Sequence, residues 1–155
     1  MDIDRDVLAR DNRQISILME MRANQALSEH ELTAVQAHML LYILHHSEEG
    51  TSLTAIHQEL GVSKAALSSL VKRLREKGYV QVERCAGDDR RKLLFPTEKG
   101  RNIRASLEHS IGTLQERMYR CFSPQELAEL DRMQKKMLLG LSVSNEETNK
   151  EVSQL

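Results

Sequence analysis

The basic side chains of this chain are concentrated in one segment, from Ser63 to Lys92. The segment holds nine Lys or Arg residues against four Asp or Glu residues, a net charge of +5. Residues 1–62 hold four basic and ten acidic residues, and residues 93–155 hold nine of each, so the net charge of the whole chain is −1. Lys and Arg bind phosphate through charge-assisted hydrogen bonds. The nearly neutral average therefore conceals a local binding site for a polyanion.

The first half of this segment has the pattern of an amphipathic helix, from Ser63 to about Lys77. One face is apolar and is expected to be buried: Ala66, Leu67, Leu70, Val71 and Leu74. The other face carries small and basic side chains, and we predict that these contact DNA: Ser63, Lys64, Ala65, Ser68, Ser69, Lys72 and Arg73. Short side chains let a helix lie deep in the major groove, where Lys or Arg reaches guanine or phosphate. The alternative is an ordinary solvated helix face.

The second half predicts a charged β-hairpin. Apolar and polar residues alternate from Tyr79 to Arg84, residues 86–89 have the composition of a turn, and apolar residues return at Leu93. Five side chains of this hairpin are predicted to bind DNA: Arg84, Asp88, Arg90, Arg91 and Lys92. An arginine guanidinium is attracted by the negative potential of a narrow minor groove. The alternative is a polar hairpin tip that binds nothing.

Two helices are predicted before the basic segment. Apolar residues recur at helical spacing over residues 4–27, without Gly or Pro. Thr33 and Gln36 have the spacing of a capping box, and the apolar residues that follow predict a second helix that ends before Gly50. Both apolar faces must be buried against other surfaces.

A short third helix directly precedes the basic one. Ser52 can cap its N-terminus, and Gly61 ends it. Only Val62 separates this glycine from Ser63, which can cap the next helix. Two helices joined by so short a turn predict a helix-turn-helix.

Two long helices are predicted after the hairpin. The first covers residues 97–122, although Gly100 and Gly112 weaken it locally. The second begins at residues 123–126, where Ser-Pro-Gln-Glu supplies a cap and a capping-box glutamate. From Ser142 onward the chain is polar, and we expect the helix to fray. The predicted fold class is mostly α with a small β-hairpin.

The composition limits the classes of function that the chain could have. With 40% hydrophobic and 29% charged residues, the 155 residues are expected to form a single domain, residues 1–155, with its own core. Aromatic residues make up only 3%, without Trp, which argues against base stacking on single strands or RNA. The chain has no motif of an enzyme and none for a cofactor, so we expect neither catalysis nor a cofactor. With no apolar run long enough to cross a membrane and an acidic N-terminus, we expect a cytoplasmic protein without membrane contacts.

Three further residue sets suggest a signal that could regulate the protein. Cys85, at the base of the hairpin, could be an oxidation switch, whereas Cys121 has less to suggest it; the alternative for both is an inert, reduced thiol. The six histidines have no metal-ligand spacing, so no metal site is predicted. A stripe with Met19, Met39 and Tyr42 could line an effector pocket, or it could be part of the core.

Four sequence strings together resemble the MarR family of bacterial transcription regulators. They are Leu-Thr-x-x-Gln at 32–36, Glu-Lys-Gly-Tyr-Val at 76–80, Asp-Asp-Arg-Arg-Lys at 88–92 and Thr-Glu-Lys-Gly at 97–100. Their order and spacing make the match specific, and it covers nearly the whole chain. The resemblance implies a winged helix-turn-helix over residues 33–96, with the hairpin as the wing.

The resemblance also implies a homodimer. Residues 1–30 and 97–143 would be the dimerisation helices, which flank the winged helix-turn-helix, and residues 144–155 would be a frayed tail. By position, Arg90 matches the arginine at the tip of the family's wing, which enters the minor groove, and Asp88 matches the acid that orients it. Val82 and Pro96 depart from the family's pattern, and Val82 removes one expected phosphate contact, which Arg84 could replace.

These patterns predict a homodimeric, sequence-specific regulator of transcription that binds double-stranded DNA at a pseudo-palindromic operator. We expect a repressor whose affinity for DNA falls when a small-molecule effector binds. Two alternatives remain open. One is a winged-helix module whose basic face docks an acidic protein. The other is the same fold acting as a redox or metal sensor.

Overall fold

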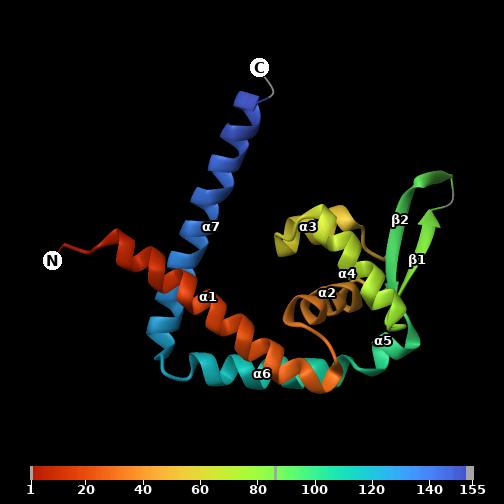
Figure 1. The fold of residues 1–155 in the computed structure, drawn as a ribbon, viewed down its shortest axis with the longest axis horizontal. Helices are drawn as coiled ribbons and strands as arrows, with labels where there is room; N and C mark the ends of the chain where they lie inside the picture. The colour runs from red at the N-terminus through yellow and green to blue at the C-terminus, as the bar shows by residue number, and fades with distance from the viewer. Residues whose placement is uncertain (1, 86, 153–155) are drawn as a thin grey trace. The chain divides into compact units, whose positions relative to one another are not determined.

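The structure is a computed structural model that describes residues 2–85 and 87–152, with the side chains of residues 85, 88–91 and 143–152 left out. Figure 1 shows the order of the helices and strands. Their bounds are α1 Arg5–Leu27, the 3₁₀ helix η1 Ser28–His30, α2 Ala34–His45, α3 Leu53–Leu60, α4 Lys64–Glu76, β1 Val80–Cys85, β2 Asp88–Pro96, α5 Glu98–Asn102, α6 Arg104–Tyr119 and α7 Pro124–Val152. The mostly helical fold with a two-stranded antiparallel hairpin confirms the predicted fold class.

The chain forms two compact units, residues 1–114 and 115–155. The core of the first unit includes the C-terminal end of α1, most of α2 and one face of α4. Its largest fully buried side chains are Leu27, Met39, Leu40, Ile43, Leu44, Ile56, Leu67, Leu74, Pro96 and Leu107. Among the described residues, no helix is both long and apolar enough to span a bilayer.

The start of α2 is fixed by three side chains, and the predicted capping box is confirmed. The Thr33 hydroxyl accepts a hydrogen bond from the Gln36 N–H at 3.2 Å, and the Gln36 side chain accepts one from the Thr33 N–H at 3.1 Å. The Asn24 carboxamide of α1 accepts a third hydrogen bond from the Ala34 N–H at 2.7 Å. Because the first N–H groups of a helix have no partner inside it, these contacts set where α2 begins and join it to α1.

The helix-turn-helix is formed by α3 and α4, as predicted. The hydroxyls of Ser52 and Ser63 cap the two helices by accepting the N–H groups of Ala55 and Ala66. Gly61 ends α3 with φ +68°, a conformation that side chains other than glycine rarely adopt. The turn is therefore specified by two caps and one glycine.

The hairpin follows α4, and an isolated β-bridge joins it to Thr51. β1 and β2 pair antiparallel, with Val80 opposite Pro96 and Arg84 opposite Lys92, and the register shifts after Arg84. Thr51 pairs with Leu94 of β2 through two backbone hydrogen bonds of 3.1 and 2.7 Å. This bridge holds the base of the hairpin to the chain that leads into α3.

The single helix predicted over residues 97–122 is wrong, because the structure has two helices there, α5 and α6, that meet at Ile103. α5 is held to the base of the hairpin: the Thr97 hydroxyl donates to the Gly78 carbonyl at 2.5 Å, and the Arg101 guanidinium donates to the Pro96 carbonyl at 3.0 Å. The hairpin therefore fixes the direction of α5, and the chain turns at Ile103 before α6 begins. In the second unit, α7 continues to Val152, through the segment that we expected to fray.

Candidate nucleic-acid interface

The buried face of α4 holds the helix against the core. Leu67 and Leu74 are completely buried, and Val71 is 8% exposed. Leu70 is half-buried. Ala66, which we predicted to be buried, is exposed, because a helical period gives the direction of a side chain but not how far the neighbouring surface extends.

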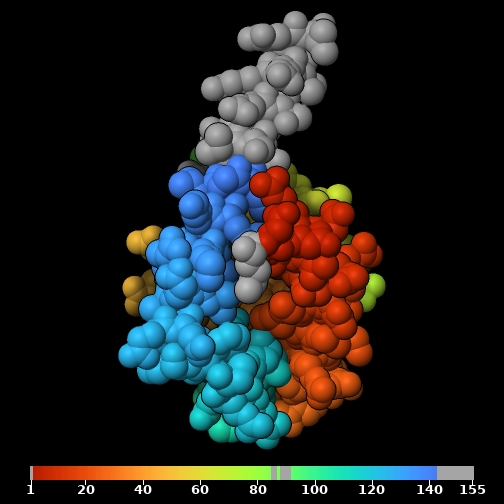
Figure 2. All heavy atoms as spheres, turned by 90° about the vertical axis from the view of Figure 1, so that its left-hand side faces the viewer, coloured from red at the N-terminus to blue at the C-terminus, as the bar shows by residue number. Residues whose placement is uncertain are grey.

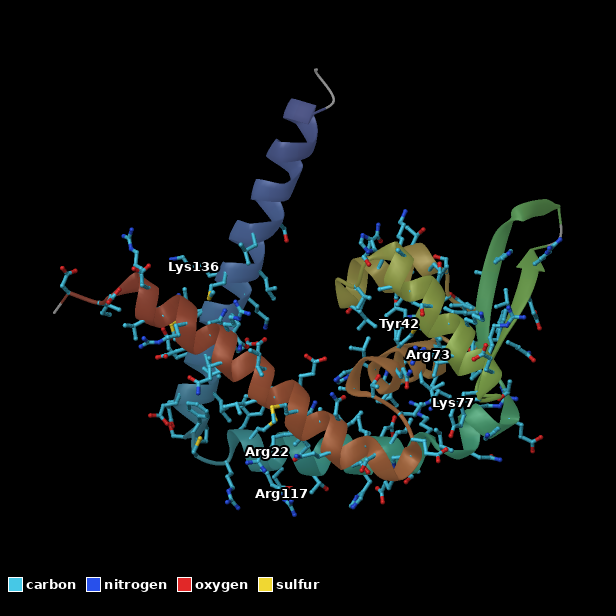
Figure 3. The ribbon with its side chains drawn as sticks, viewed as in Figure 1. Arg22, Tyr42, Arg73, Lys77, Arg117 and Lys136 are labelled. Atoms are coloured by element: carbon cyan, nitrogen blue, oxygen red, sulfur yellow. The ribbon has the colours of Figure 1, made fainter. Side chains whose placement is uncertain are left out.

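The opposite face of α4 is solvent-exposed and carries the residues predicted to contact DNA. All seven are exposed: Ser63, Lys64, Ala65, Ser68, Ser69, Lys72 and Arg73. They lie on one helix, and Figure 3 shows Arg73 among the side chains that project from α4. The Ser68 hydroxyl donates to the Lys64 carbonyl at 3.2 Å, which leaves its oxygen free to accept.

The cations of this face have no partner in the described part of the chain. Lys64, Lys72, Arg73 and Arg75 form no side-chain hydrogen bond and no ion pair with any other described residue, whereas Arg104 and Arg132 pair with glutamates on their own helices. Unpaired cations repel each other, and an external polyanion removes that repulsion. The face is therefore suited to a row of phosphates.

The described part of the hairpin adds two cations. Arg84 and Lys92 are opposite each other in the register, and both are exposed. Residues directly opposite in an antiparallel pair project from the same side of the sheet, where two like charges are unfavourable without a counterion. The side chains of four further predicted residues, Cys85, Asp88, Arg90 and Arg91, lie outside those that the structure describes.

Two grooves flank the exposed face of α4. The larger, of about 590 Å³, runs between α3, α4 and the hairpin and is lined by Ser52, Leu53, Thr54, Ser68, Val71, Arg75, Val82, Lys92 and Leu94. The other, of about 470 Å³, is lined by Ser69, Lys72, Arg73, Glu76 and Lys77. Arg75 was absent from our predicted site. Its place seven residues after Ser68, on the same helix face, is the signal that could have identified it.

The residues proposed for an effector pocket have different environments. Met39 is completely buried in the core, Met19 is half-buried, and the half-buried Tyr42 stacks on the His46 ring at a centroid distance of 4.2 Å. The pocket stays a prediction. Cys121 is exposed.

One cluster of titratable side chains joins α6 to the last residue of α2, outside the helix-turn-helix. Glu108 accepts a hydrogen bond from Arg104 at 2.9 Å, and its carboxylate lies 3.5 Å from the His45 ring. The hydrogen bond from Arg104 lowers the pKa of Glu108, and the contact with His45 lowers it further. Within the described residues there is no group of three or more His, Cys, Asp or Glu side chains that could hold a metal ion.

Comparison with known proteins tests the family resemblance. The model of the MarR family matches residues 30–91, which run from the end of η1 through the helix-turn-helix into the hairpin. Over these residues the chain matches the MarR family.

Two solved structures of protein–DNA complexes have the same fold as this chain. The complex of S. aureus MepR with DNA is 24% identical to this chain and has a TM-score of 0.80; the match covers 90% of this chain and 99% of MepR. A variant of E. coli MarR in complex with operator DNA is also 24% identical, with a TM-score of 0.79 and coverage of 89% and 99%. At this identity the likeness shows the fold.

A curated relative is more similar in sequence but over a shorter stretch. The HTH-type transcriptional regulator TtmR of Methylorubrum extorquens is 35% identical over 89 residues. That stretch is 56% of this chain and 45% of the relative, so the match spans less than half of the relative's length.

Proposed function

We propose that this chain is a MarR-family regulator of transcription: a homodimer that binds duplex DNA sequence-specifically and acts as a ligand-responsive repressor. The observation that carries the proposal is the exposed face of α4, whose cations Lys64, Lys72, Arg73 and Arg75 have no partner among the described residues. A helix fits the major groove, and Lys or Arg on its outer face contacts guanine or phosphate. The complexes of MepR and MarR with DNA support the same use of this fold.

The homodimer is supported by apolar side chains that each unit leaves exposed. In α1 these include Leu8 at 56%, Ile15 at 55% and Leu18 at 47% exposure. Figure 2 shows the outer surface of α1, red to orange, turned toward the viewer along the helix. In α7, Leu138 and Leu141 are each 64% exposed. A soluble monomer rarely exposes so much apolar surface, and a second copy of the chain would cover it.

The dimer determines the form of the operator. A two-fold axis presents two copies of α4 in opposite orientations, so the target is a pseudo-palindrome. The two half-sites would be centred about 10 base pairs, or one helical turn, apart. An effector that changes the separation of the two α4 helices would break this register and release the DNA. The family resemblance is what supports repression and response to a ligand.

The test is fluorescence anisotropy of the purified protein with DNA from upstream of its own gene and with scrambled DNA, between about 50 and 200 mM salt. A preference of roughly a thousandfold or more for the native fragment supports a specific regulator. Salt-sensitive binding without preference for any fragment would favour a basic surface that docks an acidic protein.

Lys72→Ala measures the contribution of the exposed face of α4. Removing one phosphate contact should lower the slope of log affinity against log salt by about 0.9. Arg13→Ala is the control, because Arg13 is an exposed cation on α1, and its slope should equal that of the wild type. Equal slopes for both variants would remove Lys72 from the interface.

Arg90→Ala measures the contribution of the wing. Because a narrow minor groove attracts arginine most strongly, the variant should lose affinity mainly for operators with A·T-rich flanks. The measurement compares two duplexes that differ only in these flanks. An equal loss on both duplexes would mean that Arg90 contacts the phosphate backbone without entering the minor groove.

A further inference from the structure

We infer that Lys77 positions the recognition helix α4 instead of contacting DNA, by holding the C-terminal end of α4 to the turn between η1 and α2. The inference rests on the proposed function and deepens it. By composition, Lys77 would be counted among the cations that bind phosphate, since it lines the same groove as Lys72 and Arg73. Its hydrogen bonds distinguish it from them.

Lys77 joins two segments that are far apart in the sequence. It is the C-cap residue of α4, and its N–H donates to the carbonyl of Arg73 at 3.0 Å. Its ammonium group donates a hydrogen bond to the backbone carbonyl of Glu31, 46 residues earlier. Figure 3 shows Lys77 at the end of α4. The side chain is therefore engaged within the protein, whereas those of Lys72 and Arg73 are not.

The acceptor, Glu31, is an unusual residue. It ends η1 with φ +56°, and among the described residues it is the only one other than glycine with a positive φ. Carbonyl groups at the end of a helix lack donors within that helix. The Lys77 ammonium supplies a donor at this turn, directly before the capping box that starts α2.

A second lysine holds the same end of α4 from the other direction. The Lys99 ammonium of α5 donates to the Lys77 carbonyl at 2.7 Å and lies 4.8 Å from the centre of the Tyr79 ring. A cation near the C-terminal end of a helix is also favoured by the helix dipole. Backbone carbonyls at Glu31 and Lys77 thus connect the η1 turn, α4 and α5 through two lysine side chains.

The position of this helix end matters for reading bases. A helix of 13 residues is roughly 20 Å long, so a rotation of about 10° around its centre displaces each end by roughly 2 Å. Hydrogen bonds to base edges need donor–acceptor distances of about 2.7–3.2 Å, so such a displacement breaks them. Phosphate contacts by flexible lysine side chains tolerate such a displacement better than hydrogen bonds to base edges do. Loss of Lys77 should therefore reduce sequence preference more than general affinity for DNA.

The experiment compares Lys77→Met with Lys72→Met by fluorescence anisotropy. The probes are the duplex of highest affinity that the wild-type protein selects from random-sequence DNA, and a scrambled duplex of the same composition. Lys77→Met should lose about tenfold or more in affinity for the selected duplex, with little change on the scrambled duplex and an unchanged salt slope. Lys72→Met should weaken binding to both duplexes and lower the slope by about 0.9.

Three results separate the inference from its rivals. A slope that falls by about 0.9 for Lys77→Met would make Lys77 a phosphate contact and overturn the inference. Equal losses on both duplexes would indicate general destabilisation and would also overturn it. If the wild-type protein selects no duplex at all, the proposed function itself fails, which is a distinct outcome.

A second variant keeps the test decisive if Lys77→Met does not fold. Lys99→Met removes the donor to the Lys77 carbonyl from the α5 side, and Lys99 lines neither groove beside α4. The inference expects the same loss of preference with an unchanged slope. Wild-type preference in Lys99→Met would show that this end of α4 does not need its contact with α5 and would overturn that part of the inference.

Discussion

The helices α1 and α2 follow each other in the sequence and both carry apolar side chains, but they bury them very differently. In α2, seven of 12 residues are buried, and Met39, Leu40 and Ile43 have no exposed surface. In α1, only Ala23 and Leu27 of 23 residues are buried. Apolar residues in α2 therefore stabilise the fold of the single chain, whereas those along α1 are available to another surface. The stability change caused by a substitution in α2 should therefore be independent of protein concentration. The effect of a substitution on the exposed face of α1 should depend on it.

The largest expected effect is that of Leu40→Ala in α2. Truncating a completely buried leucine removes its packing and leaves a cavity, which should lower the free energy of unfolding by about 2–5 kcal/mol. Urea unfolding measures this loss. The difference from wild type should be the same at low and high protein concentration, and a difference that varied with concentration would place Leu40 in an interface.

The next effect is that of Leu18→Glu in α1. A charge on the exposed apolar face should cost the protomer little, but a dimer that buried it would have to desolvate an unpaired carboxylate. If the proposed dimer forms, sedimentation should show monomers of the variant at concentrations where the wild-type protein sediments as a dimer. Arg13→Glu, at an exposed polar position of the same helix, is the matched control. A wild-type dimer that survives Leu18→Glu would move the interface away from this residue.

A smaller difference is expected between the N-terminal caps of the two helices. Thr33→Ala removes the hydroxyl that caps α2 in the core and should cost about 1 kcal/mol. Asp4 caps α1 by accepting the Asp6 N–H at 2.9 Å, where the helix is exposed and can fray without disturbing the core. Asp4→Ala should therefore change the thermal midpoint less than Thr33→Ala. A larger change in the thermal midpoint for Asp4→Ala than for Thr33→Ala would mean that the start of α1 is packed against another surface in solution.

The smallest effect is a stabilisation at the turn between the helices. Glu31 has φ +56°, and a left-handed conformation costs a residue with a side chain about 1–2 kcal/mol relative to its usual region. Glu31→Gly relieves that cost, and keeps the carbonyl that Lys77 contacts, but it also makes the unfolded chain more flexible. A net gain of roughly 0.5 kcal/mol is expected in urea unfolding. A loss of stability would show that the Glu31 side chain contributes to the turn.

Local sequence signals predicted most of the fold. The caps at Thr33, Ser52 and Ser63 and the glycine at position 61 each act within four residues, so they can be identified without knowing the rest of the molecule. The alternation of residues 79–84 likewise predicted β1. The exposed cations of α4 followed from the helical period, because apolar residues on one face leave the other to solvent.

What the sequence could not predict depends on contacts between distant residues. The turn at Ile103 depends on Thr97 and Arg101 bonding to carbonyls of the hairpin base. The role inferred for Lys77 depends on a carbonyl 46 residues away. Lysine and threonine side chains form hydrogen bonds with many kinds of partner, so the residue type alone does not identify the partner. Only the folded chain brings these groups together.

Gly100 of α5 illustrates how a contact can be specified by the absence of a side chain. A Cβ atom at this position would lie 2.3 Å from the backbone carbonyl oxygen of Tyr79, which is rigid because it accepts the Thr97 N–H. No rotamer change can relieve an overlap between a Cβ and a backbone atom. Any residue with a side chain at position 100 therefore requires the backbone at the junction between the hairpin and α5 to shift.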